Sequence, residues 1–315
     1  MLIRSEFDIQ FFFHSPVAVV AMLHVHPSLD AQLRRPDTVH IEHLDGTIAT
    51  PIPAKQYLDC FGNRCDRFLA PAGLVRLSGM TVIEDSGEPD IIETGAEQHA
   101  IEDLPAETLQ FLLSSRYCQV DQLSHAATDL FGHTSTGWAR AIAIRDWVHN
   151  HVTFDYTKAR PTKTALDVYT ERTGVCRDFQ HLAITLTRAM NIPARYVTGQ
   201  LGDIRSPYSS PGDYSAWYQV YLGGKWWTMD ARHNEPRVGR VLMATGRDAT
   251  DVALTTSFGV ADLKYFYVES NEMNPDGTLV PVPGAPATSQ PMQPQPPGAV
   301  SSHLQQQQKL IVPAA

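Results

Sequence analysis

The stretch that most constrains the fold is residues 212–234, GDYSAWYQVYLGGKWWTMDARHN. Two runs rich in aromatic and β-branched residues flank Gly223-Gly224, a pair typical of the tight turn of a β-hairpin. The pattern therefore predicts two antiparallel strands joined at these glycines. Ser215 opens the first strand and Asp230 ends the second, so two polar groups bracket an apolar ribbon.

A helix and a strand are predicted directly before this hairpin. In residues 175–190, VCRDFQHLAITLTRAM, apolar residues recur at helical intervals, and after a Pro-marked break residues 193–201 have the composition of a strand. The loop 202–213, rich in Gly, Pro and Ser, then leads into the hairpin and is expected to form the rim of a cleft. This order predicts a helix packed on an antiparallel sheet.

Residues 1–100 have an all-β pattern. Short alternating runs are separated by Asp-Gly, Gly-Asn and Pro signals, which predicts a sandwich or a small barrel. Polar residues such as Glu6 and Asp8 interrupt the apolar N-terminus, so it is interpreted as two strands rather than a signal sequence. His24 and His26 fall on one face of a predicted strand with no third ligand, and we interpret them as a half-exposed strand face.

The pattern changes to helical near residue 101. Residues 104–119 and 134–152 both carry helical spacing, and the Ser/Thr cluster 134–136 is expected to cap the second helix. Further predicted strands reach residue 272, after which Pro, Gln and Ser dominate. The predicted organisation is a β-rich domain at 1–100, a core at 101–275 and a disordered tail at 276–315.

Composition excludes several classes of function. The chain is 43% hydrophobic and 19% charged with a formal charge of −9, which argues against a nucleic-acid or anionic-membrane partner. No apolar run approaches the roughly 18–20 residues of a transmembrane helix, so a cytoplasmic location is expected. Cys60 and Cys65 are interpreted as small reduced residues on facing strands, and no second ligand pair lies at zinc-finger spacing. We expect no cofactor and no metal.

Cys176 lies where a nucleophilic cysteine would be placed. It falls between a Gly-containing loop and the predicted helix, in TERTGVCRDFQHL. In the first turn of a helix, the macrodipole and unpaired N–H groups stabilise the thiolate, which is the form that attacks carbonyl carbons. Such a nucleophile also needs a base, usually His, and an acid that orients the base.

The ordered set formed by GVCRDFQHLAITLTRAMNIPARYVTG, the hairpin and GRVLMATGRDATDVALTTSFG closely resembles the bacterial transglutaminase-like superfamily over roughly residues 1 to 270. The resemblance implies an α+β fold: a papain-like core, preceded by an all-β N-terminal domain, that carries a Cys-His-Asp triad. The family's nucleophile falls on Cys176 and its acid on Asp230. The base, His of a HAW motif, falls on Ser215 of SAW, and a serine hydroxyl cannot accept the thiol proton near neutral pH.

Three other histidines are candidates for the missing base. His181 lies about 140° around the helix from Cys176 and is expected to pack in the core. His233 is three residues past Asp230, an odd offset that points to the opposite face of an extended strand unless the chain is turning. It is nevertheless the favoured substitute, because His151 is not constrained by its surroundings. Tyr156 is expected to form a wall of the cleft.

Three functions remain open. The first is hydrolysis or transfer at peptide, isopeptide or glutamine amides through a thioester on Cys176, impaired by the loss of the family histidine. The second is a pseudoenzyme that binds a peptide or protein partner in the old cleft. The third is a redox or zinc-binding thiol protein that uses Cys60, Cys65 and Cys118.

Overall fold

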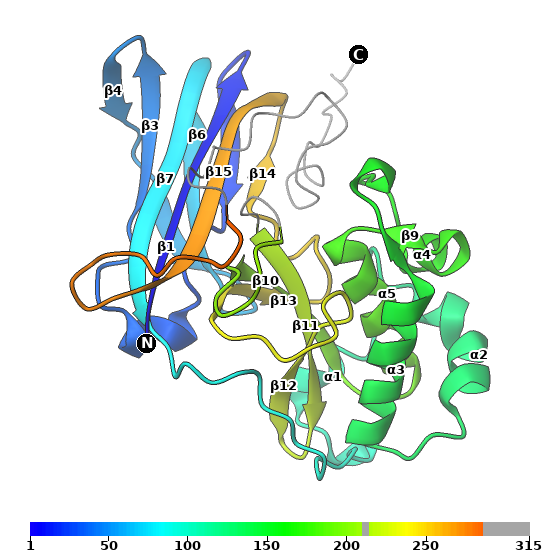
Figure 1. Cartoon of the computed structure of the whole chain (residues 1–315). Helices are drawn as coiled ribbons and strands as arrows, with labels where there is room; N and C mark the ends of the chain where they lie inside the picture. Colours follow the sequence, from blue (N-terminus) through cyan, green and yellow to red (C-terminus); the bar gives the residue numbers. More distant parts are fainter. Residues whose placement is uncertain (210–213, 286–315) are drawn as a thin grey trace, which may run out of the picture.

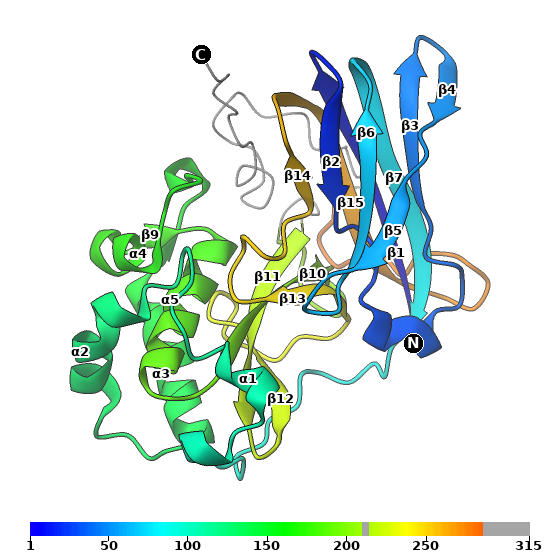
Figure 2. The same ribbon diagram turned by 180° about the vertical axis from the view of Figure 1, so that it is seen from behind.

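The computed structural model describes residues 1–209 and 214–285. A β-sandwich, a four-stranded central sheet and a layer of helices follow one another across the molecule (Figure 1). The central sheet therefore lies between the sandwich and the helices, and Figure 2 shows the same arrangement from behind. The predicted α+β class, with a helix packed on an antiparallel sheet, is confirmed.

One sheet of the sandwich has the strand order β15-β1-β7-β3-β4 and the other the order β14-β2-β6-β5. Alternate residues of β1 are buried, as expected for a strand with one face in a core. The first sheet contains β1 (Leu2–Phe13), β3 (Val39–Asp45), β4 (Ile48–Pro51), β7 (Gly73–Glu84) and β15 (Ala261–Met273). The second contains β2 (Val17–Ala21), β5 (Lys55–Leu58), β6 (Arg64–Ala70) and β14 (Thr255–Ser257).

The last two strands of the chain belong to this sandwich. β15 pairs with β1, from Leu2 opposite Met273, and β14 pairs with β2. The sequence boundary at residue 101 assigned both strands to the core, whereas their hydrogen bonds join them to the N-terminal strands. Local patterning identifies a strand but carries no information about a partner some 260 residues away, as the register of β1 and β15 illustrates.

The central sheet has the order β12-β11-β10-β13 and is antiparallel throughout. Its strands are β10 (Ala194–Leu201), β11 (Tyr214–Leu222), β12 (Lys225–Met229) and β13 (Arg240–Gly246). The predicted hairpin is β11–β12, and Gly223 and Gly224 have φ values of 57° and 80°, the left-handed conformation that such a turn needs.

The helical layer is built around α5 (Cys176–Ala189), which packs on β10 and β11. The helices that pack on it are α2 (Val120–Phe131), α3 (Trp138–His151) and α4 (Ala165–Glu171). The short elements of the chain are α1 (Ala106–Leu109), β8 (Thr153–Phe154), β9 (Thr173–Gly174) and the 3-10 turns Pro27–Gln32, Ile101–Asp103 and Tyr156–Lys158. In the described ranges, none of the helices is long and apolar enough to span a membrane.

The helix predicted over 104–119 is wrong except at α1. Beyond it the backbone bonds to distant buried groups: Arg188 donates to the carbonyl of Leu113, and Tyr117 N–H donates to Asp248. The neighbouring α2 was not predicted. The helix over 134–152 is confirmed as α3, although Gly137, rather than a Ser or Thr, stands at its N-cap without a side-chain bond.

His24 does not lie on a half-exposed strand face, as the sequence predicted. It lies beyond the end of β2 and is buried, with Nδ1 3.1 Å from Asp37 and Nε2 2.8 Å from Asp66. Burial alone lowers the pKa of His24, but the two carboxylates raise it to about 9. The environment of His24 is therefore a buried ion triad.

Candidate active site

Cys176 is the first residue of α5 and is buried, with 5% of its surface exposed. The helix begins here because Val175 is extended and the Asp178 carboxylate accepts the Val175 N–H at 3.0 Å. Gly174 makes room for that carboxylate, since a Cβ there would lie 2.6 Å from the Cβ of Asp178. The thiol therefore stands at the positive end of the helix dipole.

Asp230 follows β12 directly and bends the chain behind it. Its Oδ1 accepts the backbone N–H groups of Arg232 at 3.0 Å and His233 at 3.2 Å. This turn returns the His233 ring to the same carboxylate, with Nδ1 2.8 Å from Oδ2. The odd-offset argument from an extended strand therefore does not apply, because the chain is no longer extended after Asp230.

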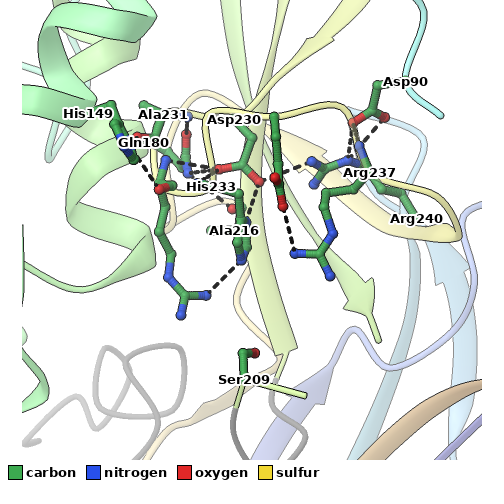
Figure 3. Close-up of polar contacts among 12 residues, drawn as sticks. Asp90, His149, Gln180, Ser209, Ala216, Asp230, Ala231, His233, Arg237 and Arg240 are labelled. Carbon is green, nitrogen blue, oxygen red and sulfur yellow. Dashed lines mark hydrogen bonds and ion pairs between the residues drawn. The ribbon is translucent and has the colours of Figure 1, made fainter. Parts of the chain in front are cut away.

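The Asp230 carboxylate is 4% exposed and lies between three side chains (Figure 3). Gln180 Nε2 donates to Oδ1 at 3.1 Å, and Arg240 donates to Oδ2 at 3.1 Å, on the oxygen that also faces His233. Burial alone raises the pKa of Asp230, but Arg240 and His233 hold it well below its usual range. The carboxylate is therefore ionised at neutral pH.

The contacts of His233 assign its tautomer. An ionised Asp230 accepts a hydrogen bond from Nδ1–H, and Arg232 Nη1 lies 3.2 Å from Nε2. A guanidinium only donates, so Nε2 is an acceptor. A neutral imidazole with its proton on Nδ1 is the form that takes a proton from a nucleophile.

One pocket joins these groups. Cys176, Ser215 and His233 line it together with Tyr156, which was predicted as a cleft wall. The lining also includes Arg232 and Arg237, and residues of β10 and the loop after it, of β11, of β15 and of the segment after β15: Gln200, Leu201, Gly202, Asp203, Tyr208, Ser209, Tyr214, Val268, Glu269, Ser270, Asn271, Val282 and Ala285. Of the predicted rim, residues 202–209 are described and 210–213 lie outside the described residues. Of the predicted tail, 286–315 also lie outside them.

The four predicted site residues are Cys176, Ser215, Asp230 and His233, and their contacts differ. Asp230 bonds to His233, and both Cys176 and His233 line the pocket. Ser215 is 8% exposed and lines the same pocket, but among the described residues the polar partners of Asp230 do not include it. The remaining side-chain candidates have other roles. His181 accepts the N–H of Ala249 in the core, and His151 contacts the carbonyl of Tyr169.

Sequence reasoning missed three supporting residues. Gln180 lies one helical turn after Cys176, a spacing that places both on one face of α5, and its amide oxygen accepts the N–H of Ala231. His149 Nδ1 donates to the carbonyls of Ala231 and Arg232, which fixes the turn that carries His233. Arg240 comes from β13, and no pattern in the sequence connects it with Asp230.

The thiols of the third alternative are scattered. Cys60 is exposed, while Cys65 and Cys118 are buried, and within the described ranges these three are free thiols. Burial raises the pKa of Cys65 to about 11 and that of Cys118 to about 12. These environments do not favour thiolate chemistry at these residues.

Comparisons with known proteins agree with the geometry. The family model of the transglutaminase-like superfamily matches residues 124–231, a range that contains Cys176, Ser215 and Asp230 and ends two residues before His233. An uncharacterized protein of Mycobacterium leprae (strain TN) is 28% identical over 215 residues, 64% of this chain and 76% of that protein.

Two solved structures are also similar to this chain. The crystal structure of "a Putative Cysteine Protease from Cytophaga hutchinsonii" is similar with a TM-score of 0.70 and 32% identity, covering 89% of this chain and 93% of that one. The periplasmic domain of TgpA from Pseudomonas aeruginosa, bound to ethylmercury, matches with a TM-score of 0.35 and 14% identity, over 72% of this chain and 89% of that chain. On the first of these similarities and the family match, the chain belongs to the transglutaminase-like superfamily.

Proposed function

We propose that this protein is a cysteine-dependent amidase that cleaves peptide or isopeptide bonds, with Cys176 as nucleophile, His233 as base and Asp230 as the acid that orients the base. The observation that carries the proposal is the 2.8 Å contact between His233 Nδ1 and Asp230 Oδ2, on a histidine that lines the pocket of Cys176. A residue outside the family's usual position thereby supplies the imidazole that Ser215 lacks.

The chemistry follows from these positions. His233 Nε2 takes the thiol proton, and the Cys176 sulfur attacks the amide carbonyl carbon. The same imidazole then gives its proton to the leaving amine, so a thioester remains on the sulfur. Water resolves the thioester to a carboxylic acid, and a primary amine in place of water gives a new amide. The expected partner is a peptide or protein substrate, and the cytoplasmic location stays a prediction.

The alternative is a pseudoenzyme that binds a peptide or protein in the same pocket. The serine at position 215 favours this alternative, because it stands where the family carries its catalytic histidine. The His233–Asp230 pair, in which Asp230 is buried against Gln180 and Arg240, weighs for the enzyme instead.

Alkylation of Cys176 by iodoacetamide tests the base without knowledge of the substrate. The rate is followed by peptide mass spectrometry from pH 5.5 to 9 in the parent, His233→Ala and Ser215→Ala. We expect His233→Ala to slow alkylation at pH 7 by at least tenfold and to shift the profile to higher pH. Ser215→Ala is the matched control and keeps the parent profile. Equal profiles in the parent and His233→Ala overturn the assignment of the base.

Turnover is tested with a quenched-fluorescence peptide library. Cleavage that Cys176→Ala abolishes, and that His233→Ala lowers by about 10²- to 10⁴-fold, is the expected result. No cleavage by the parent, alongside normal alkylation, favours the pseudoenzyme.

A further inference from the structure

Arg232 is held against the proposed base in a way that the chemistry does not require. Its Nη1 lies 3.2 Å from His233 Nε2, and its guanidinium carbon lies 4.3 Å from the centre of the Phe154 ring. The side chain also lines the pocket of Cys176. The guanidinium thus donates a hydrogen bond to Nε2, the nitrogen that has to receive the thiol proton in the proposed reaction.

Among the described residues, no carboxylate is paired with the charge of Arg232. Within residues 1–209 and 214–285, each other arginine of the site has an acidic partner: Arg237 contacts Asp203 at 3.4 Å, and Arg240 contacts both Asp90 and Asp230. The same range gives Arg232 only an imidazole nitrogen and an aromatic face. It is therefore a cation with unused hydrogen-bonding capacity in the pocket wall.

The backbone of Arg232 is fixed by hydrogen bonds, whereas its guanidinium has weaker partners. The N–H donates to Asp230 at 3.0 Å, and the carbonyl accepts from His149 at 3.0 Å. The guanidinium, in contrast, is held by one neutral acceptor and by a ring. A carboxylate brings a negative charge and can take two parallel N–H···O bonds from arginine, whereas a neutral imidazole nitrogen brings no charge and takes one bond. An anionic ligand would therefore displace the imidazole as the partner of Arg232.

We propose that Arg232 binds a carboxylate of the substrate beside the bond to be cleaved, and that its move from His233 Nε2 to this carboxylate frees the base. The proposal rests on the proposed function for the role of His233. The carboxylate belongs either to an acidic side chain or to the C-terminus of a peptide.

A pair of alkylating reagents isolates the charge effect. Iodoacetate and iodoacetamide react with the same thiol, and only the first is anionic. Their rates at Cys176 are compared at pH 7 in the parent, Arg232→Gln and Arg232→Lys. Cys60, which is exposed, serves as the reference thiol within each molecule. The control variant is Arg67→Gln, which removes one charge from an exposed position on β6.

We expect Arg232→Gln to lower the ratio of iodoacetate to iodoacetamide rates at Cys176 on the order of tenfold, as for the loss of one positive charge from the wall of the pocket that the thiol lines. Arg232→Lys keeps the charge without the planar pair of donors and should give an intermediate ratio. Arg67→Gln keeps the parent ratio. An unchanged ratio in Arg232→Gln overturns the proposal.

Failure of the proposed function gives a different result. If His233 is not the base, His233→Ala leaves both alkylation rates unchanged. The ratio of iodoacetate to iodoacetamide rates still falls in Arg232→Gln in that case, because it measures the charge of Arg232. Protection experiments then identify the source of the carboxylate. Peptides ending in a free carboxylate are compared with amidated ones, and internal Glu with Gln, as blockers of iodoacetamide at Cys176. Stronger protection by one charged member of either pair in the parent, lost in Arg232→Gln, supports the proposal. Equal protection by charged and neutral members contradicts it.

Discussion

His233 and Asp230 are three residues apart, and the imidazole Nδ1 of the first lies 2.8 Å from the carboxylate Oδ2 of the second. The contact is local because Asp230 also binds the backbone N–H of His233. A short turn after β12 thus carries both the proposed base and the acid proposed to orient it. This pair does not depend on the register between β11 and β12, unlike a pair formed between positions 215 and 230.

Replacement of Asp230 by asparagine should uncouple the base. The introduced amide presents no charge to hold the Nδ1–H tautomer, and Arg240 loses an anionic partner in a buried site. For Asp230→Asn we expect Cys176 alkylation at pH 7 to slow by at least tenfold, measured with iodoacetamide. Arg67→Gln, which changes the net charge by one unit at an exposed position of β6, is the control for a change of net charge. A parent-like rate in Asp230→Asn would show that the carboxylate does not orient the base.

A histidine at position 215 should rescue the loss of His233. In His233→Ala the Asp230 carboxylate is available, and position 215 lines the same pocket. We expect His233→Ala/Ser215→His to recover part of the Cys176 alkylation rate at pH 7 relative to His233→Ala, and Ser215→Asn in the same background to recover none. No gain with histidine would mean that the pocket no longer accepts a base at the family position.

Stability should fall with pH between about 6.5 and 9 because of His24. Its pKa is raised from 6.5 to about 9 by Asp37 and Asp66, so its contribution is complete below pH 6.5 and is lost as pH rises through 9. A shift of this size corresponds to about 3 kcal/mol at most. Urea unfolding of the parent at pH 6 and pH 9.5 measures this loss. In His24→Gln the difference between the two pH values should largely disappear, and a difference as large as in the parent would assign it to other groups.

Gly202→Ala should distort the wall of the pocket. A Cβ at this position would overlap the backbone carbonyl oxygen of Ser270 in β15, and backbone cannot move aside as a side chain does. We expect a loss of about 1–3 kcal/mol in the free energy of unfolding, measured in urea. Gly95→Ala is the control, since its nearest contact is the flexible Glu93 carboxylate at 3.4 Å. Equal stabilities of the two variants would contradict the predicted overlap.

The sequence was sufficient where structure is local. Gly223-Gly224 predicted the hairpin turn, and the spacing of apolar residues predicted α5 with Cys176 at its start. It was insufficient where groups distant in the sequence determine the backbone conformation or the environment of a side chain. The backbone near Leu113 follows the buried Arg188 rather than its own helical spacing, and His24 is held by carboxylates 13 and 42 residues away. In the site, Arg240 reaches Asp230 from another strand, which periodicity cannot reveal.

The pairing of β1 with β15 has a consequence for the time at which the protein becomes functional. During synthesis, at roughly 5–20 residues per second, β15 follows β1 by some tens of seconds. Cys176 and His233 both emerge before β15, which supplies Glu269, Ser270 and Asn271 to the pocket wall. A nascent or truncated chain therefore carries its thiol and its base without the wall that receives a substrate. β15, the last of the described strands, therefore completes the pocket, because the cleft forms only once the whole sandwich has formed.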